Sequence, residues 1–266
     1  MLALIAGSGA LPTELAERLD VPPLVCALDG FGPDDLAVDV TFRLETLGTL
    51  LAVLRDNGVT HVCMAGAIGR PVLDPAAIDA ATLPLVPLLQ QAMTSGDDGA
   101  LRAAITAFES AGLVVDGAHQ VAPDLLPPAG CPTDAQPADN DRTDATRGAA
   151  IVAAMAAVDI GQACVVQRHQ ALAVEGSFGT DWMLQSLTTR PDAGGGILFK
   201  APKPGQDRRV DLPTIGPATI VSACAAGLAG VVIEAGGVIV LDLAGVIQTC
   251  NRLGLFLWVR DAPAPG

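Results

Sequence analysis

Apolar residues in the first half of the chain alternate between short continuous runs and helical spacing. The run Leu2–Ala6 is uninterrupted, as expected of a strand buried in a parallel sheet. Further strands are predicted at 23–28, 61–65 and 113–116, and helices at 11–19, 47–57, 83–93 and 98–111. Strands that alternate with helices predict a Rossmann-like parallel sheet covered on both faces.

The second half has a different pattern. A stretch rich in Pro and Asp, residues 121–142, indicates a linker, and we place the domain boundary near residue 133, giving α/β domains 1–132 and 133–266. Short turns at 169–170 and 236–237 favour some antiparallel pairing, so a mixed sheet is expected. The predicted elements are helices at 144–158, 179–189, 217–226 and 243–253, and strands at 163–168, 171–175, 197–201, 231–234, 238–241 and 255–259.

Composition narrows the class of protein. Of 266 residues half are apolar and 17% are charged, so the chain can bury a sizeable core. The formal net charge of −14 argues against nucleic acid, which requires a basic face. Six scattered cysteines without a C-x-x-C pair or a visible signal peptide predict reduced thiols in a cytoplasmic protein. The apolar segment 218–246 is interrupted by Glu234 and Asp242, which favours packed elements over a membrane span.

The most informative stretch is the loop 200–217. Four of the chain's fifteen Lys and Arg residues lie between Lys200 and Arg209, and Asp207 and Asp211 are interleaved with them. Gly216-Pro217 then opens a helix, because proline is tolerated in a first helical turn. Cations, carboxylates and a helix N-terminus at one place predict a phosphate site. The alternative is a solvated loop with surface ion pairs.

Two loops of the first half follow predicted strands, where parallel sheets bind ligands. Gly7-Ser8-Gly9-Ala10 resembles half of a dinucleotide fingerprint, but residue 12 is proline where the third glycine is expected. This loop therefore favours a nucleotide or diphosphate contact, with a nicotinamide or flavin oxidoreductase as an alternative. Gly66 and Arg70 follow a later strand, and Arg70 is either a phosphate-binding fork or a surface arginine.

The positions of the cysteines and histidines in the sequence restrict which metal ions and which catalytic histidines are plausible. No Cys/His cluster has the spacing of zinc ligands, so a bound metal would be Mg²⁺ or Mn²⁺, held by carboxylates and substrate phosphates. His61 and His169 are expected to be structural. His119, just after a predicted strand, is the histidine placed most like a site residue.

The loop Lys200 to Pro217 resembles the signature of the UDP-2,3-diacylglucosamine pyrophosphatases of lipid A synthesis, the family distinct from the metallophosphoesterase-type enzymes. The resemblance continues, in the expected order, through nearly the whole chain. The other segments that carry it include Gly7-Ser8-Gly9, Ala65-Gly66, Gly69-Arg70-Pro71, Gly117-Ala118-His119, Asp159-Ile160-Gly161-Gln162, Gly179-Thr180-Asp181 and Ala226-Gly227-Leu228.

The resemblance implies hydrolysis of UDP-2,3-diacylglucosamine to 2,3-diacylglucosamine 1-phosphate (lipid X) and UMP. Such a reaction needs neutralised phosphoryl charge and a positioned water. We expect Lys203, Asp181, Asp211 and position 225 at the catalytic centre, and Asp207, Asp211 and Glu234 as candidate metal ligands. The candidate substrate-binding residues are Gly9, Ala10, Leu11, Gly66, Arg70, Gly179, Thr180, Lys200, Arg209, Thr214, Ile215 and Gly216.

Two positions depart from the family pattern. The residue before Ala226-Gly227 is often acidic in the family but is Ala225 here, and the often acidic residue before Gly179 is Phe178. The missing carboxylate at 225 implies impaired catalysis, and keeps a non-catalytic sugar-nucleotide or lipid binding protein as an alternative. Peripheral contact with the cytoplasmic face of the inner membrane and a homodimer are both compatible with the sequence.

Overall fold

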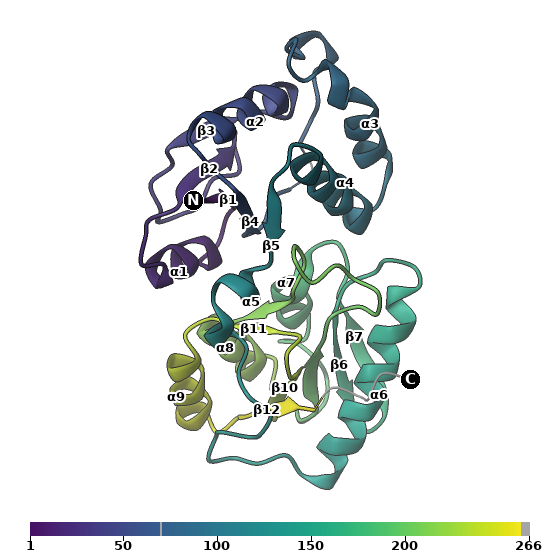
Figure 1. Ribbon diagram of the computed structural model, residues 1–266. Coiled ribbons are helices and arrows are strands. Elements are labelled where there is room, and N and C mark those ends of the chain that lie inside the picture. Colours follow the sequence, from purple (N-terminus) through teal and green to yellow (C-terminus); the bar gives the residue numbers. More distant parts are fainter. Residues whose placement is uncertain (70, 262–266) are drawn as a thin grey trace. The chain divides into compact units, whose positions relative to one another are not determined.

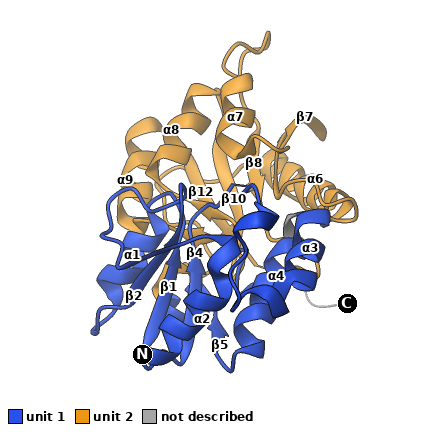
Figure 2. Cartoon of the chain, turned by 90° about the horizontal axis from the view of Figure 1, so that it is seen from above, with its two compact units in different colours: residues 1–123, 207–211 blue, residues 124–206, 212–266 orange. Residues whose placement is uncertain are grey.

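The computed structural model describes residues 1–69 and 71–261, apart from the side chains of Asp97 and Asp98. The chain forms two compact units (Figure 2). Unit 1 holds residues 1–123 and 207–211, and unit 2 holds residues 124–206 and 212–266. The units therefore divide earlier than the predicted boundary near 133. In addition, the short segment 207–211 belongs to unit 1 although both of its flanks belong to unit 2.

Unit 1 is built on a five-stranded parallel sheet (Figure 1). Its strands are β1 (Leu2–Ala6), β2 (Leu24–Leu28), β3 (Val40–Phe42), β4 (His61–Ala65) and β5 (Val114–Asp116). The spatial order is β3-β2-β1-β4-β5, and all neighbouring strands are parallel. The predicted Rossmann-like sheet is confirmed. Strand β3 was not predicted; it is only three residues long and partly exposed, so it lacks a continuous apolar run.

Helices cover both faces of this sheet. They are α1 (Leu11–Arg18), α2 (Leu47–Asp56), α3 (Val86–Thr94), α4 (Asp97–Ser110) and α5 (Ala118–Val121). Helix α2 buries Leu47, Leu50, Leu51 and Leu54, the i, i+3, i+4, i+7 stripe of an amphipathic helix. That stripe shares one core with residues of α3 and α4, while α1 packs on β1 and α5 contacts β4.

Unit 2 holds a mixed five-stranded sheet of order β12-β10-β8-β6-β7. Strands β8 (Ile197–Lys200), β10 (Gly230–Glu234) and β12 (Phe256–Arg260) are parallel, whereas β6 (Ala163–Gln167) and β7 (Gln170–Val174) pair antiparallel. The predicted mixed sheet is thus confirmed. The helices are α6 (Asp139–Ala156), α7 (Gly179–Ser186), α8 (Pro217–Ala225) and α9 (Leu243–Leu253).

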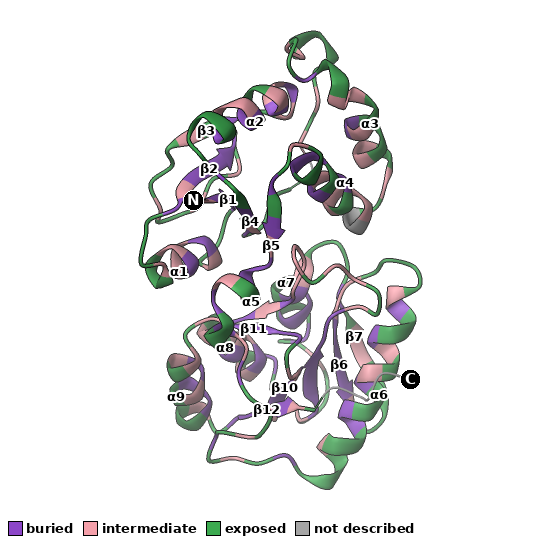
Figure 3. Cartoon of the chain, viewed as in Figure 1, coloured by how far each residue is buried: buried purple, intermediate pink, exposed green. Residues whose placement is uncertain are grey.

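Alternation along the strands of unit 2 sends side chains to two separate cores. Val165, Leu198 and Val231 pack with α7, α8 and α9, whereas Cys164, Phe199 and Val232 pack with α6. Buried positions accordingly run along the strands (Figure 3). The six cysteines are free. Within residues 1–69 and 71–261, no helix combines the length and the apolar character that a membrane crossing requires.

The β6–β7 hairpin turns at Arg168 and His169, which both have positive φ, 49° and 64°. Such left-handed pairs form the tight turns that suit twisted hairpins. The carboxylate of Asp144, on α6, accepts hydrogen bonds from the backbone N–H groups of Arg168 (2.9 Å) and His169 (2.7 Å). Asp144 is 2% exposed, so a buried charge fixes the turn to the helix.

The second predicted hairpin, at 236–237, is wrong. Strand β11 (Ile239–Val240) does not pair with β10; it runs parallel to β9 (Thr214–Ile215) in a separate two-stranded sheet. The physical reason is that β10 already has β8 on one side and β12 on the other, so no edge is left for a hairpin partner.

A buried carboxylate organises the long β4–α3 connection in unit 1. Glu45 is 2% exposed, forms two hydrogen bonds with the Arg43 guanidinium, and accepts one from the backbone N–H of Asp74 at 2.7 Å. The hydrogen bonds from Arg43, the largest cause, lower the pKa of Glu45 to about 2.

We expect Glu45→Gln to destabilise unit 1 by about 2 kcal/mol at neutral pH, because hydrogen bonds to a charged group are lost. The folded pKa lies below the ordinary value of 4.5, so the stabilisation is complete above pH 4.5 and declines as the pH falls toward 2. Urea denaturation between pH 2.5 and 7 should show a smaller loss of stability over that range for the variant than for the wild type. Equal slopes would contradict the assignment.

Candidate functional site

The two glycine loops of unit 1 are joined directly beyond the ends of β1 and β4. Ser8 and Ala67 form a short antiparallel bridge, each N–H donating to the other's carbonyl at 2.9 Å. A Cβ atom on Gly7 would lie 2.6 Å from the Ala67 carbonyl oxygen, and one on Gly66 would lie 2.7 Å from Gly7 backbone atoms. Glycine is therefore required at both positions, and the structure brings the predicted residues Gly9 and Gly66 into neighbouring loops.

The backbone just before α1 already binds a carboxylate of the protein itself, that of Asp34. The Gly9 N–H donates to Asp34 Oδ2 at 3.2 Å, at a helix N-terminus of the kind that binds diphosphate in dinucleotide sites. A carboxylate there repels a phosphate, which weighs against the oxidoreductase alternative. Ala10 is exposed and Leu11 half-buried. Arg70, the predicted phosphate fork, lies outside the described residues.

The loop 200–217 is divided between the units. Lys200 and Lys203 belong to unit 2, residues 207–211 belong to unit 1, and Thr214 to Gly216 belong to unit 2 again. Thr214 and Ile215 form β9, and the Gly216 N–H donates to Thr219 Oγ1 at 3.2 Å as α8 begins. The N–H of Gly216, a predicted substrate-binding residue, is thus already bonded within the protein.

Lys200 is buried rather than solvated. It ends β8, is 8% exposed, and donates from Nζ to Thr180 Oγ1 at 2.7 Å. The Thr180 hydroxyl in turn donates to the carboxylate of Glu175, whose Oε1 lies 4.0 Å from Lys200 Nζ. Glu175 Oε2 also accepts the Gln162 N–H. We call Lys200, Thr180 and Glu175 the buried triad.

Glu175 was missed by sequence reasoning. It follows β7 without a motif of its own, and the only signal was its place four residues before Gly179. A buried lysine needs a counter-charge, so the burial of Lys200 could have prompted a search for one. Thr180 and Lys200, both predicted to bind substrate, are brought together by the structure.

Lys203 also has an acidic partner. Its Nζ lies 2.6 Å from Asp159 Oδ1, and its backbone N–H donates to Gln206 Oε1 at 2.8 Å. Asp159 has a positive φ of 53°, which places it in a sharp bend just after α6. The pair is partly open, because the Asp159 side chain is 38% exposed.

Arg209 is held by two carboxylates of unit 1. Its Nε and Nη2 donate to the two oxygens of Asp207 at 3.0 and 2.8 Å, and its Nη1 donates to Glu109 Oε1 at 2.7 Å. The hydrogen bond to Arg209 is the main reason that the pKa of Asp207 is lowered. The ion pairs of Arg209 agree with the surface ion-pair interpretation of the loop. The Lys203 side chain is only 11% exposed and Lys200 is buried, so these two lysines do not.

His119 lies where the segment 207–211 packs against α5. A Cβ on Gly117 would lie 2.6 Å from His119 Cε1 and 3.0 Å from Arg209 Cα. The pKa of His119 is lowered, first by burial and then by the charge of Arg208. Its buried Nδ1 has no hydrogen-bond partner among the described residues. A neutral imidazole is therefore favoured at this place.

The remaining predicted carboxylates are dispersed over several elements. Asp181 is exposed on α7, Asp211 is half-buried in unit 1, and Glu234 is half-buried at the end of β10. Ala225 is exposed at the end of α8. Over the described part of the chain, no three His, Cys, Asp or Glu side chains form a group that could hold a metal ion. A Mg²⁺ ion held by these described carboxylates would need substrate phosphates as further ligands.

The fold and the site together define a two-unit α/β protein whose polar and glycine-rich loops follow the carboxyl ends of parallel strands. Residues 1–125 match the LpxI N-terminal domain, and residues 128–258 match the LpxI C-terminal domain. The chain belongs to the LpxI family, which confirms the resemblance found in the sequence.

One curated relative agrees with this assignment. The UDP-2,3-diacylglucosamine pyrophosphatase LpxI of Caulobacter vibrioides is 39% identical over 270 residues, which cover 96% of each chain. The similarity thus spans both units and includes the segment that crosses between them.

We expect Lys200→Met to destabilise unit 2 by about 3 kcal/mol, because it leaves Glu175 buried without a counter-charge. Lys203→Met is the matched control. Its partner is partly exposed, so the loss should be about 1 kcal/mol or less. Urea denaturation of both variants measures the difference. The double variant Lys200→Met/Glu175→Gln should recover part of the loss, and strictly additive effects would contradict the coupling.

Proposed function

We propose that the protein hydrolyses the pyrophosphate bond of UDP-2,3-diacylglucosamine to 2,3-diacylglucosamine 1-phosphate (lipid X) and UMP, as a step of lipid A synthesis. The observation that carries the proposal is the 39% identity to the Caulobacter vibrioides UDP-2,3-diacylglucosamine pyrophosphatase over 96% of both chains. Two family domains matched in order along the chain support it. A cytoplasmic location, contact with the inner membrane and a homodimer belong to the same proposal.

In this proposal the cations of the 200–217 loop receive the diphosphate. Lys203 and Arg209 hold carboxylates through partly exposed ion pairs, and substrate phosphate oxygens can replace these carboxylates at little cost. Lys200 has a different role. It is buried, and it orients Thr180 and contributes positive charge at the end of β8.

Proton transfer needs a carboxylate with access to water. Asp181 meets this requirement best, because it is exposed on α7 and is the residue directly after Thr180. Asp211, two residues after Arg209, is the second candidate and is half-buried. Gly9, Ala10, Leu11 and Gly66 of unit 1 would contact the nucleotide or the sugar.

A divalent ion is part of the proposal. Mg²⁺ or Mn²⁺ would supply charge neutralisation at the phosphoryl oxygens, with Asp207, Asp211 and Glu234 as the candidate protein ligands. We expect UMP release from UDP-2,3-diacylglucosamine to stop in EDTA and to return on addition of Mg²⁺ or Mn²⁺. Release that persists after exhaustive chelation would remove the metal from the proposal while leaving the hydrolase intact.

The alternative is a non-catalytic binding protein for a sugar nucleotide or lipid, and Ala225 favours it. Position 225 is exposed at the end of α8 and carries no carboxylate, where relatives are expected to have one. Substrate that binds without release of UMP, measured by calorimetry and by chromatography of the products, would select this alternative.

We expect Ala225→Asp to raise the rate of UMP release about tenfold or more, because a carboxylate with access to water can act as a base or metal ligand. The matched control is Val221→Asp, which adds the same charge on the exposed side of the same helix. A single-turnover assay with UDP-2,3-diacylglucosamine and Mg²⁺ compares them. Equal rates for both variants and the wild type would contradict the inference from position 225.

A further inference from the structure

Two aromatic side chains of unit 2 lie in contact with each other in solvent. Phe178 is 75% exposed and Trp182 is 57% exposed, and their ring centroids are 5.3 Å apart at an interplanar angle of 47°. The chain has only six phenylalanines and two tryptophans in 266 residues. A pair of large exposed aromatic rings is a feature of ligand- or partner-binding surfaces.

The two aromatic residues lie on either side of Thr180, a member of the buried triad, in the sequence of α7. Phe178 caps α7, and Trp182 follows one helical turn later, so both flank Thr180. The Thr180 hydroxyl is the group that joins Lys200 and Glu175. The first turn of α7 therefore exposes the Phe178 and Trp182 rings and buries the Thr180 hydroxyl. Gly179 and Thr180 in this turn are predicted substrate-binding residues.

Neighbouring segments add exposed apolar side chains at the same end of the sheet. Ile160 is 41% exposed and Val174 is 47% exposed. Their segments meet at Glu175, because the Gln162 N–H donates to its carboxylate and a Cβ on Gly161 would lie 2.7 Å from its side chain. Exposed apolar side chains therefore occur on three chain segments that border the triad.

We propose that Phe178 and Trp182 form a binding surface for an acyl chain of the substrate, a proposal that rests on the function proposed above. Lys203, three residues after the triad lysine in the same loop, suits the phosphate end of such a molecule, and the aromatic rings suit its hydrocarbon. The net charge of −14, together with the exposed Asp181 that directly precedes Trp182 in the sequence, opposes docking of this particular surface on an anionic membrane. An uncharged chain meets no such repulsion.

The kinetic test is the double variant Phe178→Ser/Trp182→Ser. Both side chains are exposed, so folding should be unaffected, which circular dichroism checks. We expect KM for UDP-2,3-diacylglucosamine to rise about tenfold or more as apolar contact is lost, with little change in kcat. The matched control is Leu83→Ser, in unit 1, where the side chain is 59% exposed and KM should not change. Equal KM values for the double variant and the wild type would overturn the proposal.

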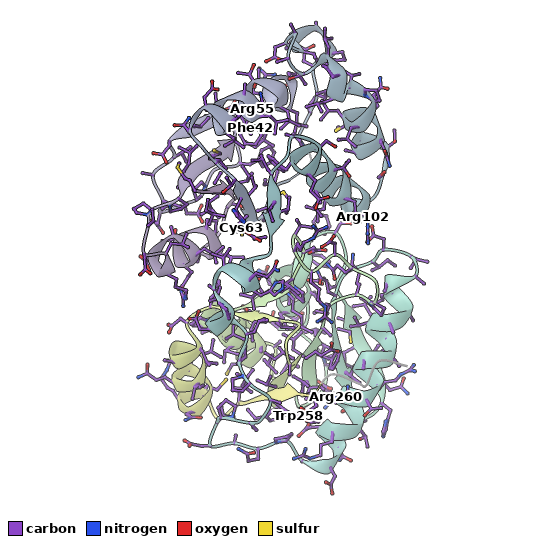
Figure 4. The ribbon with its side chains drawn as sticks, in the orientation of Figure 1. Phe42, Arg55, Cys63, Arg102, Trp258 and Arg260 are labelled. Atoms are coloured by element: carbon purple, nitrogen blue, oxygen red, sulfur yellow. The ribbon has the colours of Figure 1, made fainter. Side chains whose placement is uncertain are left out.

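A binding test does not depend on hydrolysis. With Trp258→Phe, Trp182 becomes the only tryptophan; Trp258 lies on β12 (Figure 4), where Arg142 stacks 5.0 Å from its ring. Titration with 2,3-diacylglucosamine 1-phosphate should shift Trp182 emission to the blue, and glucosamine 1-phosphate should not. A shift without UMP release would support the acyl-chain site and contradict the hydrolase proposal. UMP release without a shift would support the hydrolase and contradict the acyl-chain site.

Two further measurements separate other occupants of the same surface. Sedimentation with phosphatidylcholine vesicles tests a bilayer, and analytical ultracentrifugation tests a second copy of the chain. Vesicle binding or self-association that the double variant abolishes, with no chain-dependent shift of Trp182, would overturn the acyl-chain proposal in favour of that occupant.

Discussion

The second half of the molecule depends on a lysine that is largely buried. Lys200 is placed at the end of a fully buried strand, where its charge must be satisfied inside the protein. Glu175 supplies the opposite charge and Thr180 the intervening hydroxyl, so β8, the end of β7 and the start of α7 are fixed to one another. This constraint explains why the residues at that edge of the sheet have defined positions before any ligand binds.

The same requirement for paired charge recurs along the chain. Asp144 is buried but accepts two backbone N–H groups of a hairpin, and Glu45 is buried but pairs with Arg43 and the Asp74 N–H. In an acidic protein with few cations, each buried carboxylate is satisfied by a specific donor and organises a turn or a long connection. Ordered loops at the strand ends follow from these contacts.

Periodicity predicted the repeating elements of the fold well. The continuous apolar run 2–6 identified β1, because burial on both faces of a parallel sheet removes polar residues from a strand. The alternation of predicted strands and helices identified the parallel sheet of unit 1. The 236–237 hairpin failed for a reason that local sequence does not contain. Whether β10 has a free edge depends on β8 and β12, which are distant in the chain.

The candidate site was predicted less completely. The cations at 200, 203 and 209 stood out by their density in an acidic chain, but their partners Glu175, Asp159 and Glu109 are 25 to 100 residues away and have no common spacing. Side-chain pairing across such separations is set by tertiary packing. Family resemblance identified segments 159–162 and 179–181, yet it did not show that they meet around one buried charge.

Because residues 207–211 belong to unit 1, no single cut in the chain separates the two units. Val210 packs against the unit 1 core and Arg209 bonds to Glu109, although both residues are encoded within the second half. A fragment that stops at the linker therefore lacks an apolar side chain and a guanidinium that its own surface is shaped to receive. If the two halves are produced separately, the unit 1 protein therefore needs residues 207–211 joined to it, because truncation at the linker removes them.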